Sequence, residues 1–287
     1  MGLFARWKNF LLRKKPQPLK LGIALGSGGA KGFVHLGILS AFEEEGIVFS
    51  HVTGTSIGAI IGALYAKGFT ANDILGIVSG LNRKEFSKNL RPFTDLTFAE
   101  RFLEDYLEGD ISMLPKPFAT CATDADNNEY VLLDRGPITK AVTASSAYPP
   151  IFKAVRMDGK ELYDGAFTDA IPADVCKDLG ADFVIGVDLS AYSRKEEEKG
   201  RLSRIMGTAV SYIMPVKYRA DCKTRGYEAA DYMIRPPLRD YSPTDISQKA
   251  MDEMFLLGYE EAKHCMTEIK AAIAERERRG GDTKRKL

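Results

Sequence analysis

The chain has 287 residues, of which 45% are hydrophobic, so it is long enough and apolar enough to bury a substantial core. Its formal net charge is +1, which argues against a protein that attracts nucleic acid through a global positive field. The four cysteines are far apart and form no CxxC pair. The sequence therefore indicates neither a zinc site nor a disulfide framework, and a reducing compartment is expected.

Residues 1–18 form a basic N-terminal segment, in which aromatic and aliphatic residues alternate with Arg and Lys. Arg6 and Lys8 interrupt its apolar positions, which argues against a signal peptide, and no later segment is a long uninterrupted apolar run. We therefore expect a cytoplasmic protein. Two interpretations of the segment stay open: a short interfacial helix that makes a peripheral contact with anionic membrane, or a disordered basic tail.

The first half of the chain alternates between strand and helix patterns. The run 19–25 predicts a buried strand, and a glycine-rich turn at 26–29 leads into a helix from about Ala30 to Glu45. A second strand ends near Val52 and Thr53 and is followed by a helix over 57–67. This alternation predicts a parallel sheet with crossover helices.

Further patterns extend this α/β reading through the rest of the chain. Thr70 with Asp73 and Thr97 with Glu100 have the spacing of capping boxes, which mark helix starts. Strands are predicted at 117–123, 129–134, 182–189 and 232–236, a type I′ hairpin around Asp158-Gly159, a charged linker at 194–201, and helices over about 202–226 and 247–279. We predict a single α/β domain over residues 19–279, followed by a basic C-terminal tail at 280–287.

Gly54-Thr55-Ser56-Ile57-Gly58 fits the G-x-S-x-G pattern of a nucleophile elbow. A strand pattern precedes it and a helix rich in small residues follows, as an elbow requires. Flanking glycines remove side chains that would collide in the tight turn. Ser56 is therefore a candidate nucleophile, whereas the alternative is an ordinary βα turn in which a hydroxyl caps the helix.

The glycine-rich run Gly26–Gly32 also follows a strand and opens a helix. A dinucleotide fingerprint would need glycine where Lys31 stands, and a P-loop would need Ser or Thr after a Gly-Lys pair. The remaining interpretation is a set of backbone N–H groups at a helix N-terminus that can hold an oxyanion. Lys31 itself is either a group that attracts a phosphate headgroup or a solvated lysine at the helix start.

A nucleophilic serine needs a base, and the histidines are weak candidates. His35 and His51 are better explained by packing or structural roles. His264 remains a rival, because Ser56, Asp164 and His264 follow one another in the chain order of α/β-hydrolases, although a surface helix explains it simply. Asp164 is a carboxylate candidate, but it needs desolvation to become basic enough.

Two further acidic motifs have simpler explanations. Asp124, Asp126 and Asn128 have the first spacings of a calcium loop, but the later positions do not fit it, so we predict a hairpin turn. Asp188 ends an apolar strand, where it either faces the cleft or caps the following loop.

Three motifs in order resemble those of the patatin-like phospholipase family, in its small bacterial form. They are G-x-G-G-x-[K/R]-G at 26–32, the elbow at 54–58 and D-G-[AG] at 164–166, with a further similar segment at 144–152. The resemblance implies a three-layer α/β/α fold with a mostly parallel central sheet, and hydrolysis of acyl lipids without metal, nucleotide or other cofactor. It assigns Ser56 as nucleophile, Asp164 as general base, and the amides of Gly28 and Gly29 as the oxyanion hole. The supporting motif residues are Gly26, Lys31, Gly32, Gly54, Gly58 and Gly165.

The expected function is therefore that of a lipid acyl hydrolase of the phospholipase A, lysophospholipase or esterase type. Two alternatives share the same sequence features: an acyltransferase that passes the acyl group to an alcohol, and a non-enzymatic lipid-binding regulator that keeps the fold. The sequence indicates an acyl lipid as substrate and no nucleic acid, and it gives no oligomeric state.

Overall fold

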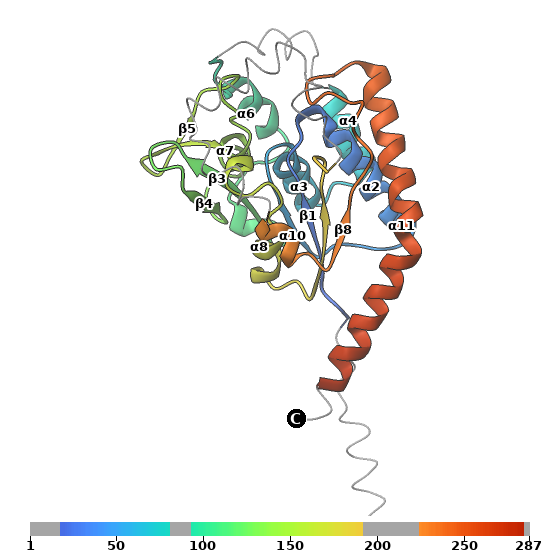
Figure 1. Cartoon of the computed structure of the whole chain (residues 1–287). Coiled ribbons are helices and arrows are strands. Elements are labelled where there is room, and N and C mark those ends of the chain that lie inside the picture. Colours follow the sequence, from blue (N-terminus) through green and yellow to red (C-terminus); the bar gives the residue numbers. More distant parts are fainter. Residues whose placement is uncertain (1–17, 81–92, 192–223, 284–287) are drawn as a thin grey trace, which may run out of the picture.

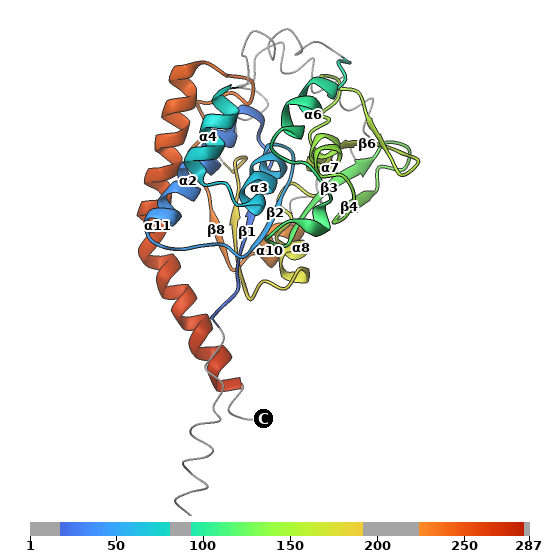
Figure 2. The same cartoon turned by 180° about the vertical axis from the view of Figure 1, so that it is seen from behind.

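The computed structural model describes residues 18–80, 93–191 and 224–283. Strands in these ranges form one sheet, and helices cover both of its faces (Figures 1 and 2). The strands are β1 (Leu21–Leu25), β2 (His51–Gly54), β3 (Phe118–Asp124), β4 (Tyr130–Leu133), β5 (Val155–Met157), β6 (Lys160–Asp164), β7 (Phe183–Val187) and β8 (Tyr232–Ile234).

The sheet is mixed and mostly parallel at its centre. Its order is β5-β6-β3-β2-β1-β7-β8, and β4 pairs with β3 outside this path. The neighbouring pairs from β3 through β2, β1 and β7 to β8 are parallel, whereas β4, β5 and β6 pair in the antiparallel sense. The predicted α/β fold with a mostly parallel sheet is confirmed.

Alternating side chains of β1 separate two cores, one on each face of the sheet. Ile23 and Leu25 belong to the larger core, whereas Ala24 belongs to a smaller core that packs under α8. Three layers result, because helices lie on both sides. The helices are α2 (Phe33–Glu44), α3 (Ile57–Lys67), α4 (Ala71–Gly80), α6 (Thr97–Glu104), α7 (Ile138–Ser145), α8 (Ala173–Asp178), α10 (Thr224–Ala229) and α11 (Gln248–Thr283), with 3-10 turns η1 (Gly29–Gly32), η2 (Ile111–Met113) and η3 (Gly165–Phe167).

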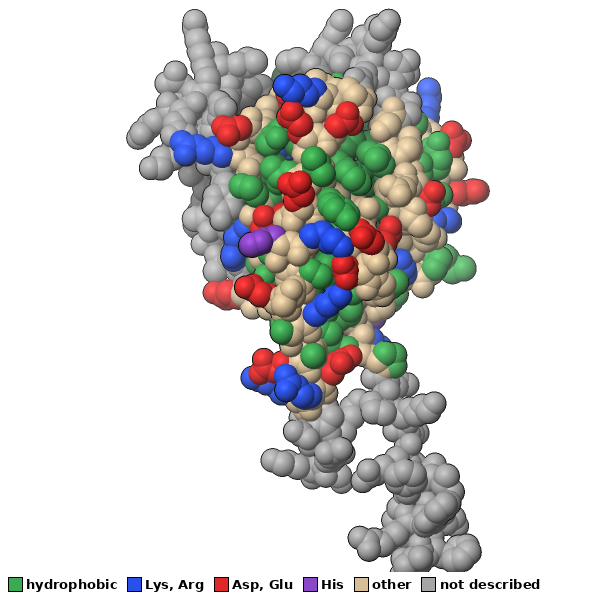
Figure 3. Space-filling view, turned by 90° about the vertical axis from the view of Figure 1, so that its right-hand side faces the viewer, with side chains coloured by type: hydrophobic (Ala, Val, Ile, Leu, Met, Phe, Trp, Pro, Cys, Tyr) green, Lys and Arg blue, Asp and Glu red, His purple; other side chains and the backbone are tan. Residues whose placement is uncertain are grey.

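The long helix α11 covers α2 and forms the face seen in Figure 3. Apolar side chains gather over the upper part of this face, and acidic and basic side chains are mixed below them. Glu45, which follows α2, accepts hydrogen bonds from Lys263 at 2.5 Å and from Lys270 at 2.6 Å. These two ion pairs lower the pKa of Glu45 to about 2 and join the end of α2 to α11.

Most of the predicted elements agree with the structure, with corrections at helix starts. The helix predicted from Ala30 is a 3-10 turn over η1 before the α-helix α2 begins at Phe33. The capping box of Thr70 and Asp73 is confirmed, because each residue's side chain accepts the other's backbone N–H. The capping box at Thr97 is wrong: Thr97 lies inside α6, and its N–H donates to Asp95.

The hairpin prediction is confirmed. β5 ends at Met157 and β6 begins at Lys160, and the two residues between them have positive φ angles of 50° and 78°, as a type I′ turn requires. α11 extends to Thr283, beyond the predicted end at residue 279. The N-terminal basic segment up to residue 17, the linker predicted at 194–201 and most of the helix predicted over 202–226 lie outside the described residues.

Candidate active site

Ser56 lies in the turn between β2 and α3 with φ 58° and ψ −123°. This positive-φ conformation is strained for a residue with a side chain, and it persists only where the surrounding structure holds it. The turn has the geometry of the nucleophile elbow that the sequence predicts.

Gly54 and Gly58 of the elbow lie where backbone segments pack closely against each other. A Cβ on Gly54 would lie 2.2 Å from the carbonyl oxygen of Gly58, and a Cβ on Gly58 would lie 2.1 Å from that of Leu25. Both distances are too short for any side chain. The start of α3 can therefore approach β1 and β2 closely only with glycine at both positions.

The sheet register brings Ser56 to Asp164. Thr120 of β3 pairs with both β2 and β4, and Ala122 pairs with both β6 and β4, so β2 and β6 occupy the same edge of β3. β2 reaches Gly54 opposite Thr120, and antiparallel β6 ends at Asp164 opposite Ala122. The two strand ends are thus about 7 Å apart along β3, and the residue two places after Gly54 meets the last residue of β6.

Asp164 is a buried carboxyl that lies next to Ser56, whose hydroxyl lowers its pKa. Its side chain also accepts the Ala166 N–H at 2.8 Å, and the residue is 1% exposed. Burial raises the pKa of Asp164 to about 7, and the hydrogen bond from the Ala166 N–H and the nearby Ser56 hydroxyl oppose this rise. The burial that Asp164 needs in order to be more basic than an ordinary aspartate is therefore present.

Ser145 is a part of the site that sequence reasoning missed. It ends α7, is fully buried, and its hydroxyl accepts the backbone N–H of Ser56 at 2.9 Å. The hydroxyl of Thr120, which also donates to the Gly54 carbonyl, lies 2.9 Å from it. Ser145 falls within the segment 144–152 that resembles the family pattern, which was the available signal.

The glycine-rich loop lies beside the elbow. A Cβ on Gly32 would lie 2.2 Å from the Ile57 side chain, and a Cβ on Gly58 would lie 2.8 Å from the Gly26 carbonyl oxygen. The loop and the start of α3 are therefore in backbone contact. This arrangement brings the two motifs together, as parallel neighbouring strands predict.

Hydrogen bonds fix most of the loop and leave two of its N–H groups. Four loop N–H groups have backbone acceptors: Gly26 donates to Val187, Ser27 to Ala170, Ala30 to Pro243 and Lys31 to Gly28, at 2.8–3.2 Å. The N–H groups of Gly28 and Gly29 have no acceptor among the described residues. These are the two donors that the sequence motif assigns to an oxyanion.

Pro243 closes over this loop from a segment distant in the sequence. Its carbonyl oxygen accepts the Ala30 N–H at 2.8 Å, and a Cβ on Gly29 would lie 2.5 Å from the same oxygen. Gly29 also has φ 57°, which favours glycine. No sequence signal connects Pro243 with the loop.

The loop lysine is not solvated. Lys31 is 6% exposed, and burial lowers its pKa, with the charge of Asp188 acting in the opposite direction. Asp188 is 2% exposed, and one of its carboxylate oxygens accepts both the N–H and the hydroxyl of Ser190 at 2.7 Å. Asp188 therefore caps the loop after β7, and the solvated-lysine interpretation of Lys31 is wrong.

The three histidines take structural positions. His35 is fully buried in α2, and its Nε2 lies 2.7 Å from the Gly26 carbonyl oxygen. His51 begins β2, and its Nδ1 lies 2.9 Å from the Ser50 hydroxyl. His264 is exposed on α11, which packs on α2 and β8.

The Asp124 motif forms the hairpin turn between β3 and β4. Its carboxylate accepts the Asp126 N–H at 3.0 Å and pairs with Lys160 at 3.1 Å, and Asn128 has φ 57°. Within the ranges that the structure describes, no group of three or more His, Cys, Asp or Glu side chains could hold a metal ion. The hairpin interpretation is confirmed.

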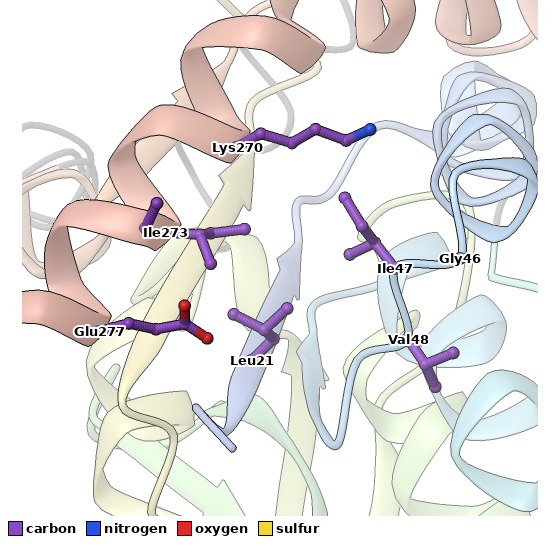
Figure 4. Close-up of a pocket in the computed structure, with 8 residues that line it drawn as sticks. Leu21, Gly46, Ile47, Val48, Lys270, Ile273 and Glu277 are labelled. Atoms are coloured by element: carbon purple, nitrogen blue, oxygen red, sulfur yellow. The ribbon is translucent and has the colours of Figure 1, made fainter. Parts of the chain in front are cut away.

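A depression of about 410 Å³ lies at the opposite end of the sheet from Ser56 (Figure 4). It is lined by Leu21 at the start of β1, by Ile47 and Val48 before β2, and by Ile273 of α11. Because Ser56 follows the carboxyl end of β2, this depression does not belong to the Ser56 site. In residues 18–80, 93–191 and 224–283, no helix combines the length and the apolar character needed to cross a membrane.

Comparisons with known proteins find relatives that match most of this chain. Human patatin-like phospholipase domain-containing protein 6 is 32% identical over 285 residues, which cover 85% of this chain and 20% of that protein. An uncharacterised NTE family protein of Mycobacterium tuberculosis is 30% identical over 178 residues, covering 60% of this chain and 49% of the relative. The chain thus spans about half or less of the length of these relatives.

The fold is also found among solved structures. VipD from Legionella pneumophila matches with a TM-score of 0.56 at 15% identity, and the match covers 88% of this chain and 67% of VipD. At this identity the likeness concerns the fold alone. A family model described as patatin-like phospholipase matches residues 23–177, more than half of the chain. The chain therefore belongs to the patatin-like phospholipase family.

Proposed function

We propose that this protein is a lipid acyl hydrolase in which Ser56 is the nucleophile and Asp164 its general base. The observation that carries the proposal is that the Ser56 side chain lies next to the buried carboxyl of Asp164, whose pKa burial raises to about 7. A carboxylate with that pKa is far more basic than an ordinary aspartate, and about half of it is in the charged form at pH 7. Family membership supports acyl lipids as the substrate class.

The proposed reaction has two halves. Ser56 Oγ attacks the acyl carbon while Asp164 takes the hydroxyl proton, and the N–H groups of Gly28 and Gly29 bind the negative oxygen of the tetrahedral intermediate. Collapse of the intermediate expels the alcohol, which receives the proton from Asp164, and leaves an acyl group on Ser56. Water then attacks the acyl-enzyme while Asp164 takes its proton. The bond between the acyl carbon and Ser56 Oγ breaks, the fatty acid leaves, and Ser56 regains the proton from Asp164.

Hydrolysis of a p-nitrophenyl acyl ester tests the assignment. Ser56→Ala and Asp164→Asn should each abolish hydrolysis. Asp158→Asn is a matched control on the same hairpin, because Asn-Gly suits a type I′ turn as well as Asp-Gly does. His264→Ala should keep wild-type activity, since that side chain is exposed on α11. Loss of activity in His264→Ala would favour a Ser–His–Asp triad instead.

The acyl acceptor and the membrane contact are parts of the same proposal. An acyltransferase would use the same acyl-enzyme with an alcohol in place of water, so product analysis with and without added acceptor separates the two. A lipid-binding regulator would not be labelled by a fluorophosphonate.

The membrane contact has a separate test. For a cytoplasmic protein with a peripheral anionic-membrane contact, deletion of residues 1–15 should reduce sedimentation with anionic liposomes.

A further inference from the structure

His35 is a buried histidine with one hydrogen-bond partner. It lies in the first turn of α2, is fully buried, and its Nε2 is 2.7 Å from the carbonyl oxygen of Gly26. Burial lowers the pKa of His35 to about 4, so the imidazole is neutral around pH 7. Because a carbonyl only accepts, Nε2 carries the hydrogen and Nδ1 is left as a bare acceptor.

The environment of Nδ1 makes His35 unfavourable for the stability of the fold. Nδ1 is buried and has no hydrogen-bond partner among the described residues. A buried polar atom without a partner destabilises the fold, and an apolar side chain of similar size would avoid that cost. The one hydrogen bond that the imidazole makes is from Nε2 to the carbonyl oxygen of Gly26.

The Gly26 peptide lies between the glycine-rich loop and the elbow at Ser56. Its N–H donates to Val187 of β7 at 3.1 Å, so β1 continues its pairing through this residue. Its carbonyl oxygen lies beside Gly58 in the first turn of α3, where a Cβ would come within 2.8 Å. Gly26 is therefore a point at which the glycine-rich loop touches the elbow, two residues before Gly28.

We propose that His35 is a positioning residue that holds the Gly28 and Gly29 amides in register with Ser56 by fixing the Gly26 carbonyl. The inference rests on the proposed function, because it gives those amides a role in the reaction. A donor stabilises an oxyanion only at hydrogen-bonding distance. A small displacement of the loop should therefore destabilise the transition state more than it weakens substrate binding. His35 itself does not touch the reacting atoms.

Two substitutions of nearly equal size separate the hydrogen bond from the packing. His35→Gln keeps an N–H donor that can reach the Gly26 carbonyl, whereas His35→Met fills a similar volume without a donor. We expect His35→Met to lower kcat about tenfold or more with KM within about twofold, and His35→Gln to recover most of that loss. Folding of each variant is checked by circular dichroism.

His51→Met is the matched control, because His51 is also largely buried but lies at the opposite end of β2 from Ser56. It should lower the melting temperature at most and leave kcat unchanged. A folded His35→Met variant with wild-type kcat would overturn the inference. Loss of the same size in His35→Gln would also overturn it, because the hydrogen bond would then not be the cause.

The wild-type protein provides a test that does not depend on a variant's folding. In a ¹⁵N-histidine NMR spectrum, His35 should be neutral, with Nε2 protonated and Nδ1 bare, and should not titrate around pH 6 to 7. A protonated Nδ1 would show that the bond to Gly26 is absent and would end the inference. If the wild-type protein hydrolyses no ester, the proposed function fails instead, whereas the spectrum still tests the bond.

Discussion

Ser56 lies next to the Asp164 carboxyl because β2 and β6 meet end to end along one edge of β3. The nucleophile candidate follows a parallel strand and the carboxyl ends an antiparallel one. The short hairpin of β5 and β6 returns the chain to β3 in the direction that ends at Ser56. The same arrangement buries the carboxyl and raises its pKa.

The raised pKa of Asp164 predicts the pH dependence of the reaction. In the proposed reaction the charged carboxylate is the base, so kcat/KM should rise with pH up to about 7 and level off above it, following the pKa of about 7. Initial rates with a p-nitrophenyl ester at constant ionic strength measure this profile. A profile that is already flat from pH 5 upwards would mean that Asp164 is not the group that controls the reaction.

The same pKa predicts an effect on stability with the opposite trend. The folded-state pKa lies above the unfolded value, so the folded protein keeps a proton that the unfolded chain has released between about pH 4 and 7. The stabilisation from this group is therefore present at low pH and is lost as pH rises through about 7. Asp164→Asn, which cannot charge, should gain melting temperature relative to wild type as pH increases from 5 to 8. A difference that stays constant, or shrinks, over this range would contradict the assignment.

Sequence patterns predicted the parts of the fold that depend on local spacing. The elbow and the glycine-rich loop each combine a strand end, small residues and a helix start, so turn chemistry alone locates Ser56 and the loop. Family resemblance was needed for Asp164, because its basicity comes from burial by strands that are distant in the sequence. The capping box predicted at Thr97 is absent because Thr97 is the first residue of α6, the N-cap is Leu96, and the Thr97 N–H donates to the Asp95 carboxylate.

The parts that could not be predicted are contacts between distant segments. Nothing in the local sequence of Pro243 indicates that its carbonyl accepts the Ala30 N–H. Likewise, a serine at the end of α7 is unremarkable until the fold brings its hydroxyl to the backbone of Ser56. Such contacts depend on tertiary packing and on how α11 and its preceding loop cover the sheet.

Ser145→Ala should impair the site, because it removes the acceptor of the Ser56 N–H. An unpaired buried N–H costs about 1–3 kcal/mol, and the strained turn at Ser56 also loses a constraint. We expect a lower melting temperature together with a lower kcat. Ser146→Ala is the neighbouring control: its hydroxyl donates to Val142 within α7, so kcat should be unchanged. Equal kcat values for the two variants would contradict the role given to Ser145.

Gly58→Ala should destabilise the protein, because the new methyl group would lie 2.1 Å from the Leu25 carbonyl oxygen. Overpacking of this kind costs about 1–3 kcal/mol in free energy of unfolding, and here the neighbour is backbone that cannot turn away. Gly76→Ala in α4 is the matched control, since its Cβ would meet nothing within 4 Å. Alanine there should add about 0.5–1 kcal/mol through helix propensity. Urea unfolding measures the change in free energy of unfolding for both variants, and the two changes should have opposite signs.

The most direct test of the central claim is covalent labelling of the wild-type protein with a fluorophosphonate, followed by mass spectrometry of the peptides. The account predicts one adduct, on Ser56, together with loss of ester hydrolysis. Labelling should disappear in Ser56→Ala and slow strongly in Asp164→Asn, while Asp158→Asn behaves as wild type. An adduct on another residue, or full ester hydrolysis by Ser56→Ala, would contradict the account.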